Sequence, residues 1–208
     1  MLRVTMLSGE QVASIPVMEL SDVRSLKQRL HRLHNFPTRF RQRLLHEGSP
    51  LGDDAKLDSI AHLELLLLSY HPTSQSQANE LVTAAMNGFV DQVEALLQKP
   101  QNPDSTDAFA MSPLTVASSA GNIDIVRLLL EAGADKDVAN NNGITALMIA
   151  SQTGHLAVAR LLLEAGADKE YFQEAFHRTG GSDQGGGKDG ESGRLLSQGK
   201  EDLFSEHV

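Results

Sequence analysis

The sequence predicts an α+β protein in which a small domain of strands and one helix precedes an all-α stack of helical hairpins and a glycine-rich tail. Three observations support this prediction. Over residues 1–72, short segments of alternating polarity surround one segment with a helical period. From residue 79 onward, a single pattern recurs at a constant interval. Residues 180–190 are rich in glycine and contain no apolar side chain, which predicts a disordered segment.

Composition limits the functions that the chain can have. The 208 residues include no cysteine, which excludes a disulfide framework and thiolate chemistry. A net charge of −9 disfavours nucleic acid as a partner, because phosphate binding requires a surplus of Lys and Arg. No apolar run approaches the roughly 20 residues of a transmembrane helix, and the first residues lack the apolar stretch of a signal peptide. We therefore expect a monomer in the cytoplasm, or alternatively in the nucleus, that does not bind a membrane.

The first two strands are predicted to form a hairpin. Residues 3–7 and 11–17 show partial alternation and flank a turn at residues 8–10. The period then changes to that of a helix, which Asp22 caps and which ends before Pro37. Four apolar residues share one face of this helix: Val23, Leu26, Leu30 and Leu33.

The segments after this helix complete a recognisable order of elements. Short strands are predicted at residues 43–46, near Leu51 and at residues 63–68. This β-β-α-β-β order, with the run 42–51 (Gln-Arg-Leu-Leu, then Gly and Leu), resembles ubiquitin over residues 1–71. The resemblance implies a ubiquitin-like β-grasp domain, followed by a linker at residues 72–78. Because the two conjugating glycines of ubiquitin are missing, we expect a fixed domain and not a transferable tag.

Ubiquitin recruits its receptors through a small exposed apolar patch. The resemblance places two members of this patch at Leu45 and Leu66, whereas the third falls at Ser8 in a shortened hairpin. We expect these leucines either to bind ubiquitin-pathway proteins or to pack against the neighbouring repeats. Six cations could attract an acidic partner or form an ordinary charged surface: Arg24, Lys27, Arg32, Arg39, Arg41 and Arg43.

The second part of the chain contains an internal repeat. Its three copies superimpose without gaps, and their glycines Gly88, Gly121 and Gly154 follow one another at the same interval (121 − 88 = 33 and 154 − 121 = 33). Each copy predicts a short helix, the glycine, and a second apolar helix that Gly133 or Gly166 caps in the later copies. One helical hairpin cannot bury its own apolar face, so the copies must stack on one another.

The period and its motifs resemble the ankyrin repeat. The motifs are the openings Ser-Pro-Leu at 112–114 and Thr-Ala-Leu at 145–147, and the recurring Gly-Ala-Asp. The resemblance implies repeats at 79–106, 107–139 and 140–172 in a domain spanning residues 79–176, and a mostly disordered tail at 177–208. Within the tail, residues 194–199 are either a decayed half-repeat or part of the disordered segment.

Several positions depart from the ankyrin pattern. Thr115 and Met148 replace a His whose hydrogen bonds between repeats we therefore expect to be absent. Pro100 replaces the first capping glycine. Ala110 stands where Gly143 fills the turn of the next repeat, and a positive φ there would cost about 1 kcal/mol.

The ankyrin resemblance also implies where partners bind. Positions that recur in every copy are used for packing, so specificity must come from the hairpin tips and the inner helices that line the concave groove. The apolar residues Phe109, Met111 and Ile144 are unusual at such tips, and we expect them to bind a partner or to dock against the first domain or the tail. The full set of expected binding residues is Met86, Asn87, Phe109, Met111, Ser119, Ala120, Asn141, Asn142, Ile144, Gln152 and Thr153.

The sequence offers no catalytic or cofactor site. Gly187-Lys188 lacks the other residues of a phosphate-binding loop. His31 and His34 are spaced for zinc, but no third ligand is placed nearby. The pair Asp53-Asp54, and Ser151 near His155, supply no nucleophile, base and orienting acid together.

We therefore expect a non-enzymatic scaffold or adaptor that binds other proteins, without metal or cofactor. Two alternatives stay open. The chain could be a fragment or accessory subunit of a larger enzyme, such as a ubiquitin ligase or a kinase, or an adaptor of the ubiquitin pathway that acts through its first domain.

Overall fold

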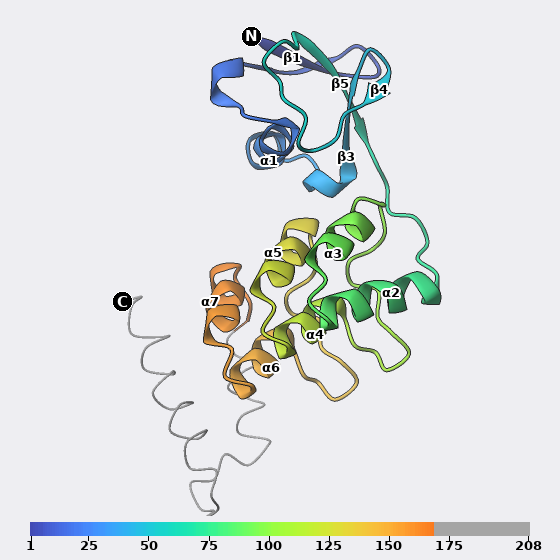
Figure 1. Cartoon of the computed structure of the whole chain (residues 1–208), viewed down its shortest axis with the longest axis vertical. Coiled ribbons are helices and arrows are strands. Elements are labelled where there is room, and N and C mark those ends of the chain that lie inside the picture. Colours follow the sequence, from blue (N-terminus) through green and yellow to red (C-terminus); the bar gives the residue numbers. More distant parts are fainter. Residues whose placement is uncertain (169–208) are drawn as a thin grey trace, which may run out of the picture. The chain divides into compact units, whose positions relative to one another are not determined.

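The computed structural model describes residues 1–168, which form two compact units (Figure 1). The N-terminal unit comprises residues 1–72 together with the short segment 97–101. The second unit comprises residues 73–96 and the chain from residue 102 onward. The predicted tail, and the end of the third repeat beyond residue 168, lie outside the described residues.

The N-terminal unit is built on a five-stranded mixed sheet in the order β2-β1-β5-β3-β4. Strands β1 and β5 are parallel, and the other neighbours are antiparallel. This order, with one helix packed on the sheet, is compatible with the predicted ubiquitin-like β-grasp. The elements are β1 (Leu2–Met6), β2 (Gln11–Ile15), η1 (Val17–Glu19), α1 (Val23–His34), η2 (Arg39–Arg41), β3 (Gln42–His46), β4 (Ser49–Pro50) and β5 (His62–Leu67).

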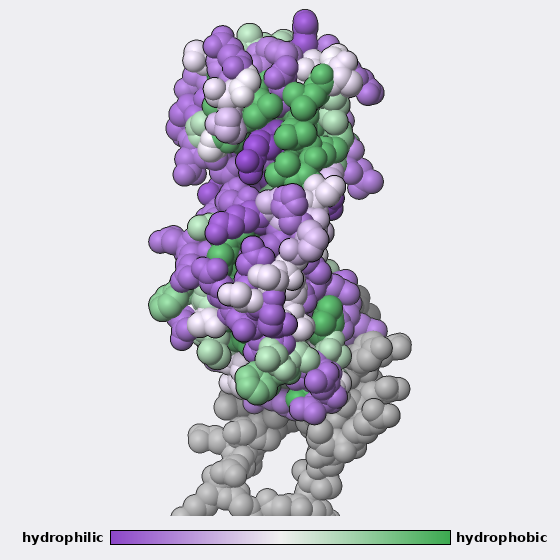
Figure 2. Space-filling model, turned by 90° about the vertical axis from the view of Figure 1, so that its right-hand side faces the viewer, coloured by the Kyte–Doolittle hydropathy of each residue, from purple (hydrophilic) through white to green (hydrophobic). Residues whose placement is uncertain are grey.

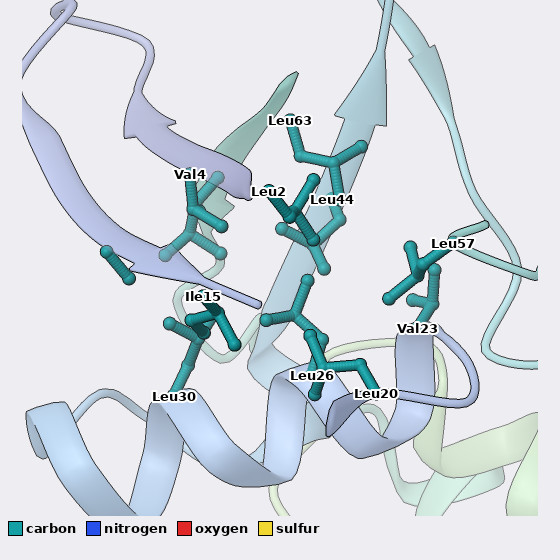
Figure 3. Packing of buried hydrophobic residues seen from close by; sticks show 12 residues of the cluster. Leu2, Val4, Ile15, Leu20, Val23, Leu26, Leu30, Leu44, Leu57 and Leu63 are labelled. Carbon is teal, nitrogen blue, oxygen red and sulfur yellow. The ribbon is translucent and has the colours of Figure 1, made fainter. Parts of the chain in front are cut away.

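Helix α1 begins and ends where the sequence predicts. The Asp22 carboxylate accepts a hydrogen bond from the Ser25 backbone N–H at 2.9 Å, and Asn35 ends the helix with a left-handed φ of 53°. Figure 3 shows side chains of α1 pointing toward those of the strands. The fully buried core residues on the two sides of this contact include Val23, Leu26, Leu30, Leu2, Val4, Leu44, Leu63 and Leu65.

The predicted core face of α1 is wrong at one position, because Leu33 is 65% exposed. Lys27 is buried instead, at 4% exposure. Its burial shows that the core-facing stripe is centred between Leu26 and Lys27, which leaves Leu33 at the edge of the stripe, in the last turn of the helix.

Lys27 and Arg39, which the sequence analysis treated as surface cations, form a buried cluster around Asp53. Lys27 Nζ lies 2.7 Å from one Asp53 carboxylate oxygen, and the Arg39 guanidinium lies 2.5 Å from the other. The three side chains are 5%, 0% and 6% exposed. The Gln98 amide, from the segment 97–101, also donates to this carboxylate at 3.0 Å. One buried carboxylate thus bonds to both buried cations.

Burial raises the pKa of the Asp53 carboxyl, but the hydrogen bond and the charge of Lys27 lower it, with smaller contributions from Gln98 and Arg39. The net effect holds the pKa below its ordinary value of 3.8. A carboxyl whose pKa is lower in the folded state stabilises the fold fully above its unfolded pKa. This stabilisation is lost as the pH falls through the folded pKa.

The second unit is a stack of three helical hairpins. Helices α2, α4 and α6 lie side by side in one layer, and α3, α5 and α7 form the second layer (Figure 1). The loops from α3 to α4 and from α5 to α6 project from the same side of the stack (Figure 1). The helices are α2 (Gln75–Met86), α3 (Val90–Leu97), α4 (Pro113–Ser119), α5 (Ile123–Ala132), α6 (Ala146–Gln152) and α7 (Leu156–Glu164).

Helix α2 begins inside the segment 72–78 that the sequence analysis assigned to a linker. The Ser74 hydroxyl accepts the Gln77 backbone N–H, and the Gln77 side chain accepts the Ser74 backbone N–H, which completes a capping box. The polar composition that favours a linker therefore serves as a helix start. Ser112 and Thr145 cap α4 and α6 in the same way, by accepting an N–H from the third residue of each helix.

A side chain from each later repeat covers the turn glycine of the repeat before it. The Asn122 amide donates to the Ala85 carbonyl at 3.1 Å, and His155 Nε2 lies 3.1 Å from the Ser119 carbonyl oxygen. A Cβ added at Gly121 would lie 2.5 Å from the His155 ring, so the glycine is required for this close approach. His155 thus has a structural role in the packing of the third repeat on the second.

We predict that Asp53→Asn destabilises the fold by about 3–5 kcal/mol at neutral pH, because it removes the buried anion that bonds to both Lys27 and Arg39. Urea unfolding of the full chain, followed by circular dichroism, measures the change. The difference between wild type and variant should shrink as the pH falls below 3.8 and through the lowered pKa, where Asp53 loses its charge in the wild type. Asp54→Asn is the control, because that side chain is 96% exposed; an equal loss in both variants would contradict the buried-cluster interpretation.

We also predict that Gly121→Ala destabilises the stack more than Gly154→Ala. Both glycines have a positive φ, 72° and 77°, so both variants carry a backbone cost of about 1 kcal/mol. Only Gly121 faces the His155 ring, and nothing lies within 4 Å of a Cβ at Gly154. Overpacking should add about 1–3 kcal/mol at Gly121, which equilibrium unfolding measures. Equal losses would mean that the His155 contact does not constrain the turn.

Candidate functional site

The loops that follow α3 and α5 form two matching fingers, at residues 107–111 in the second repeat and 140–144 in the third. In the second repeat, one oxygen of the Asp107 side chain accepts the backbone N–H groups of Phe109 and Met111, both at 2.9 Å. In the third repeat, the Asn140 side chain accepts the N–H groups of Asn142 and Ile144, at 2.9 and 3.1 Å. Each finger is therefore closed by its own side chain, and the tip backbone is fixed before any partner binds.

The second-repeat finger contains a strained residue. Ala110 has a φ of +58°, and Gly143, at the equivalent position of the third repeat, has a φ of +75°. The turn therefore requires the positive φ that the sequence analysis considered at Ala110. Ala110 adopts this left-handed conformation at a steric cost.

The three apolar residues of the fingers are unequally exposed. Phe109 is 80% exposed, whereas Met111 and Ile144 are half-buried. The Asn140 amide lies 3.5 Å from the Met111 sulfur and donates to it, which joins the two fingers. Phe109 is thus exposed to solvent, while Met111 in the same finger is half-buried and bonded to the next finger. A bulky apolar side chain held in this way on a rigid loop is typical of an interface anchor.

The other predicted binding residues lie on the inner helices and the finger tips. Met86, at the end of α2, is 53% exposed. Two of the polar residues are partly used within their own helix ends, since Asn87 donates to the Thr83 carbonyl and Thr153 donates to the Ile149 carbonyl. Ser119 is half-buried, and the remaining predicted residues are exposed: Ala120, Asn141, Asn142 and Gln152.

Sequence reasoning missed Asp107 and Asn140, which shape the fingers. Their signal was available, because both are short polar acceptors at equivalent positions of consecutive repeats, at the start of the turn. It also missed Phe89, which is 54% exposed and occupies the position of Asn122 and His155 in the later repeats. In the first repeat, that position has no preceding repeat to cover.

Leu45 and Leu66 lie on neighbouring strands of the N-terminal unit. In the register of β3 and β5, Leu45 is opposite Glu64 and Leu66 is opposite Arg43, so the two leucines are diagonal neighbours on one face. This face is opposite to the core, because the alternating residues Leu44 and Leu65 are fully buried. Both leucines are half-buried. Figure 2 shows a continuous hydrophobic area on the surface of this unit, bordered by strongly hydrophilic atoms.

Within residues 1–168, no group of three or more His, Asp or Glu side chains could hold a metal ion. His31 Nδ1 instead contacts the Phe36 carbonyl at 2.6 Å. Ser151 donates to the Leu147 carbonyl at 2.8 Å. Asp53 is engaged in the buried cluster, and the Gly187-Lys188 motif lies outside the described residues. No helix of the described part is long and apolar enough to span a membrane.

A family model described as ankyrin repeats, in three copies, matches residues 81–173. Residues 81–173 are ankyrin repeats. The match covers the helical stack from Leu81 onward and both fingers, and ankyrin repeats are protein-interaction modules. No curated protein matches the chain.

Two of the departures from the ankyrin pattern now have a structural account. Thr115, in place of the ankyrin His, hydrogen-bonds the Ser112 hydroxyl at 2.9 Å. Met148 lies in the equivalent place, and its sulfur accepts the Thr145 N–H at 3.3 Å. Both side chains therefore bond to the cap of their own ankyrin repeat.

We predict that Ala110→Gly stabilises the ankyrin stack by about 0.5–1 kcal/mol, because glycine relieves the strain of the left-handed conformation. The matched reverse substitution, Gly143→Ala, should destabilise it by about 1 kcal/mol. Thermal unfolding of the full chain measures both. If Ala110→Gly lowers the stability instead, the finger does not hold the positive φ in solution.

Proposed function

We propose that this protein is a non-enzymatic scaffold or adaptor whose ankyrin fingers and inner groove bind a protein partner. The observation that carries the proposal is the 80% exposure of Phe109 on a finger that its own Asp107 side chain holds closed. Burial of an exposed Phe side chain stabilises a complex by roughly 1.5–3 kcal/mol. Because the loop is already fixed, little of this gain is lost to ordering it.

The rest of the stack supports the same surface. The residues of α4 from Pro113 to Ser118 are buried, because α4 packs between α2 and α6. The exposed Met86 and Gln152 and the half-buried Ser119 occupy one position that differs between repeats, and these residues can distinguish one partner from another.

We predict that the triple variant Phe109→Ala, Met111→Ala and Ile144→Ala loses partners that the intact chain recovers in an affinity pull-down. Removal of an anchor from the centre of an interface costs more than about 1 kcal/mol. Leu156→Ala on helix α7 is the control, because Leu156 is also an exposed apolar residue, at 46%, but lies outside the fingers.

Circular dichroism should show that both variants keep the helical stack. If the triple variant recovers every partner as well as the Leu156→Ala variant does, the fingers are not the binding surface.

The diagonal pair Leu45 and Leu66 favours a second binding surface for ubiquitin-pathway proteins on the N-terminal unit. Both leucines lie on the outer face of the sheet, where part of each side chain is available to a partner. A ubiquitin-binding domain added to the ¹⁵N-labelled full chain should shift the amide signals of β3 and β5 in NMR spectra. The variant Leu45→Ala should reduce these shifts, and spectra that do not change on addition would exclude this surface.

A further inference from the structure

We propose that the second-repeat finger binds a partner segment in which a bulky apolar residue is flanked by Lys or Arg. This inference rests on the proposed function and names the chemistry of the partner. The apolar residue of the partner would pack against Phe109. Its cations would pair with Asp104, Asp107 and Asp135, which have no counter-ion in the described chain.

The charge of the stack is the first support. Residues 73–168 contain 4 Lys and Arg against 11 Asp and Glu, a net charge of 4 − 11 = −7. Residues 1–72 contain 9 against 8, a net charge of 9 − 8 = +1. No Lys or Arg occurs between Lys99 and Arg127, the stretch that contains the whole second-repeat finger. Such a surface attracts cationic segments and repels acidic ones.

Three carboxylates lie in the finger or close to it in the chain or through a hydrogen bond. Phe109 donates its N–H to Asp107 at 2.9 Å. Asp104 lies three residues earlier and accepts the backbone N–H of Asp135 at 2.9 Å. None of Asp104, Asp107 and Asp135 forms an ion pair with any residue in the range 1–168.

The next repeat provides an internal comparison. Asp137 accepts the Asp168 N–H at 2.8 Å, as Asp104 accepts that of Asp135. Asp137, however, has a cation, since Lys136 Nζ lies 3.3 Å from its carboxylate. The two pairs share the same backbone hydrogen bond and differ in their counter-ion, and the pair without a cation includes Asp104, five residues before the exposed Phe109 in the chain.

The pKa of the Asp104 carboxyl is raised, chiefly by burial. Burial raises its pKa, the hydrogen bond from Asp135 lowers it, and the Asp135 charge raises it again, so that the pKa lies above its ordinary value. A cation from a partner would favour the charged form of this half-buried carboxylate more than that of a fully hydrated one. An Arg would in addition stack on the Phe109 ring.

A phage-displayed library of random peptides of about 12 residues, selected on the immobilised full chain, tests the proposal. The enriched peptides should carry a net positive charge and at least one bulky apolar residue. Fluorescence anisotropy then measures the binding of synthetic copies to three variants: Phe109→Ser, the double variant Asp104→Asn with Asp135→Asn, and Asp124→Asn. The Asn residues keep the side-chain oxygens that accept hydrogen bonds, so the double variant removes charge alone.

Phe109→Ser and the double variant should each raise the dissociation constant about tenfold or more, and the double variant should remove most of the salt dependence. Asp124→Asn, on the exposed side of α5, should leave it unchanged. Enriched peptides that are neutral or acidic but still need Phe109 would overturn the charge inference and leave the proposed function standing. Peptides that bind all three variants equally, or no enrichment at all, would overturn the finger as the site.

Discussion

The packing of each helical hairpin on the next is the constraint on which the second unit depends. A single hairpin exposes an apolar face, so every repeat needs a neighbour, and the neighbours must approach closely at the turn. Gly121 makes this approach possible, because its missing side chain leaves room for the His155 ring. This packing also determines where the fingers lie. Phe109 is presented at a fixed place because α4, directly after it, is locked between two other helices.

Much of this architecture follows from the sequence, because the constant period and the capping residues act locally. The start of α1 at Asp22 and the left-handed Ala110 are examples, since each depends only on nearby backbone geometry. The positions of Lys27 and Arg39 were not predictable in this way. Their burial depends on Asp53, which follows 26 and 14 residues later, and a pairing over that distance leaves no local pattern.

The sequence predicted the apolar residues of the candidate site, but not which of them is most exposed. The period identified the finger residues, yet it gave Phe109, Met111 and Ile144 the same weight. Only the fold shows that Met111 and Ile144 are half-buried while Phe109 is exposed, because exposure depends on how adjacent repeats pack. The lack of a counter-ion at Asp104 could not be predicted from the sequence either. Asp104 and Asp137 occupy the same place in the repeat, and only Asp137 pairs with a lysine, Lys136.

The position shared by Phe89, Asn122 and His155 distinguishes the first repeat from the two that follow it. Asn122 and His155 each present a nitrogen to the carbonyl of the preceding turn, and a phenyl ring has no group that could replace it. The unit that contains Phe89 is therefore an end unit by its own chemistry. A copy of this unit in the interior of the array would place a phenyl ring where Asn122 and His155 bond to the preceding turn.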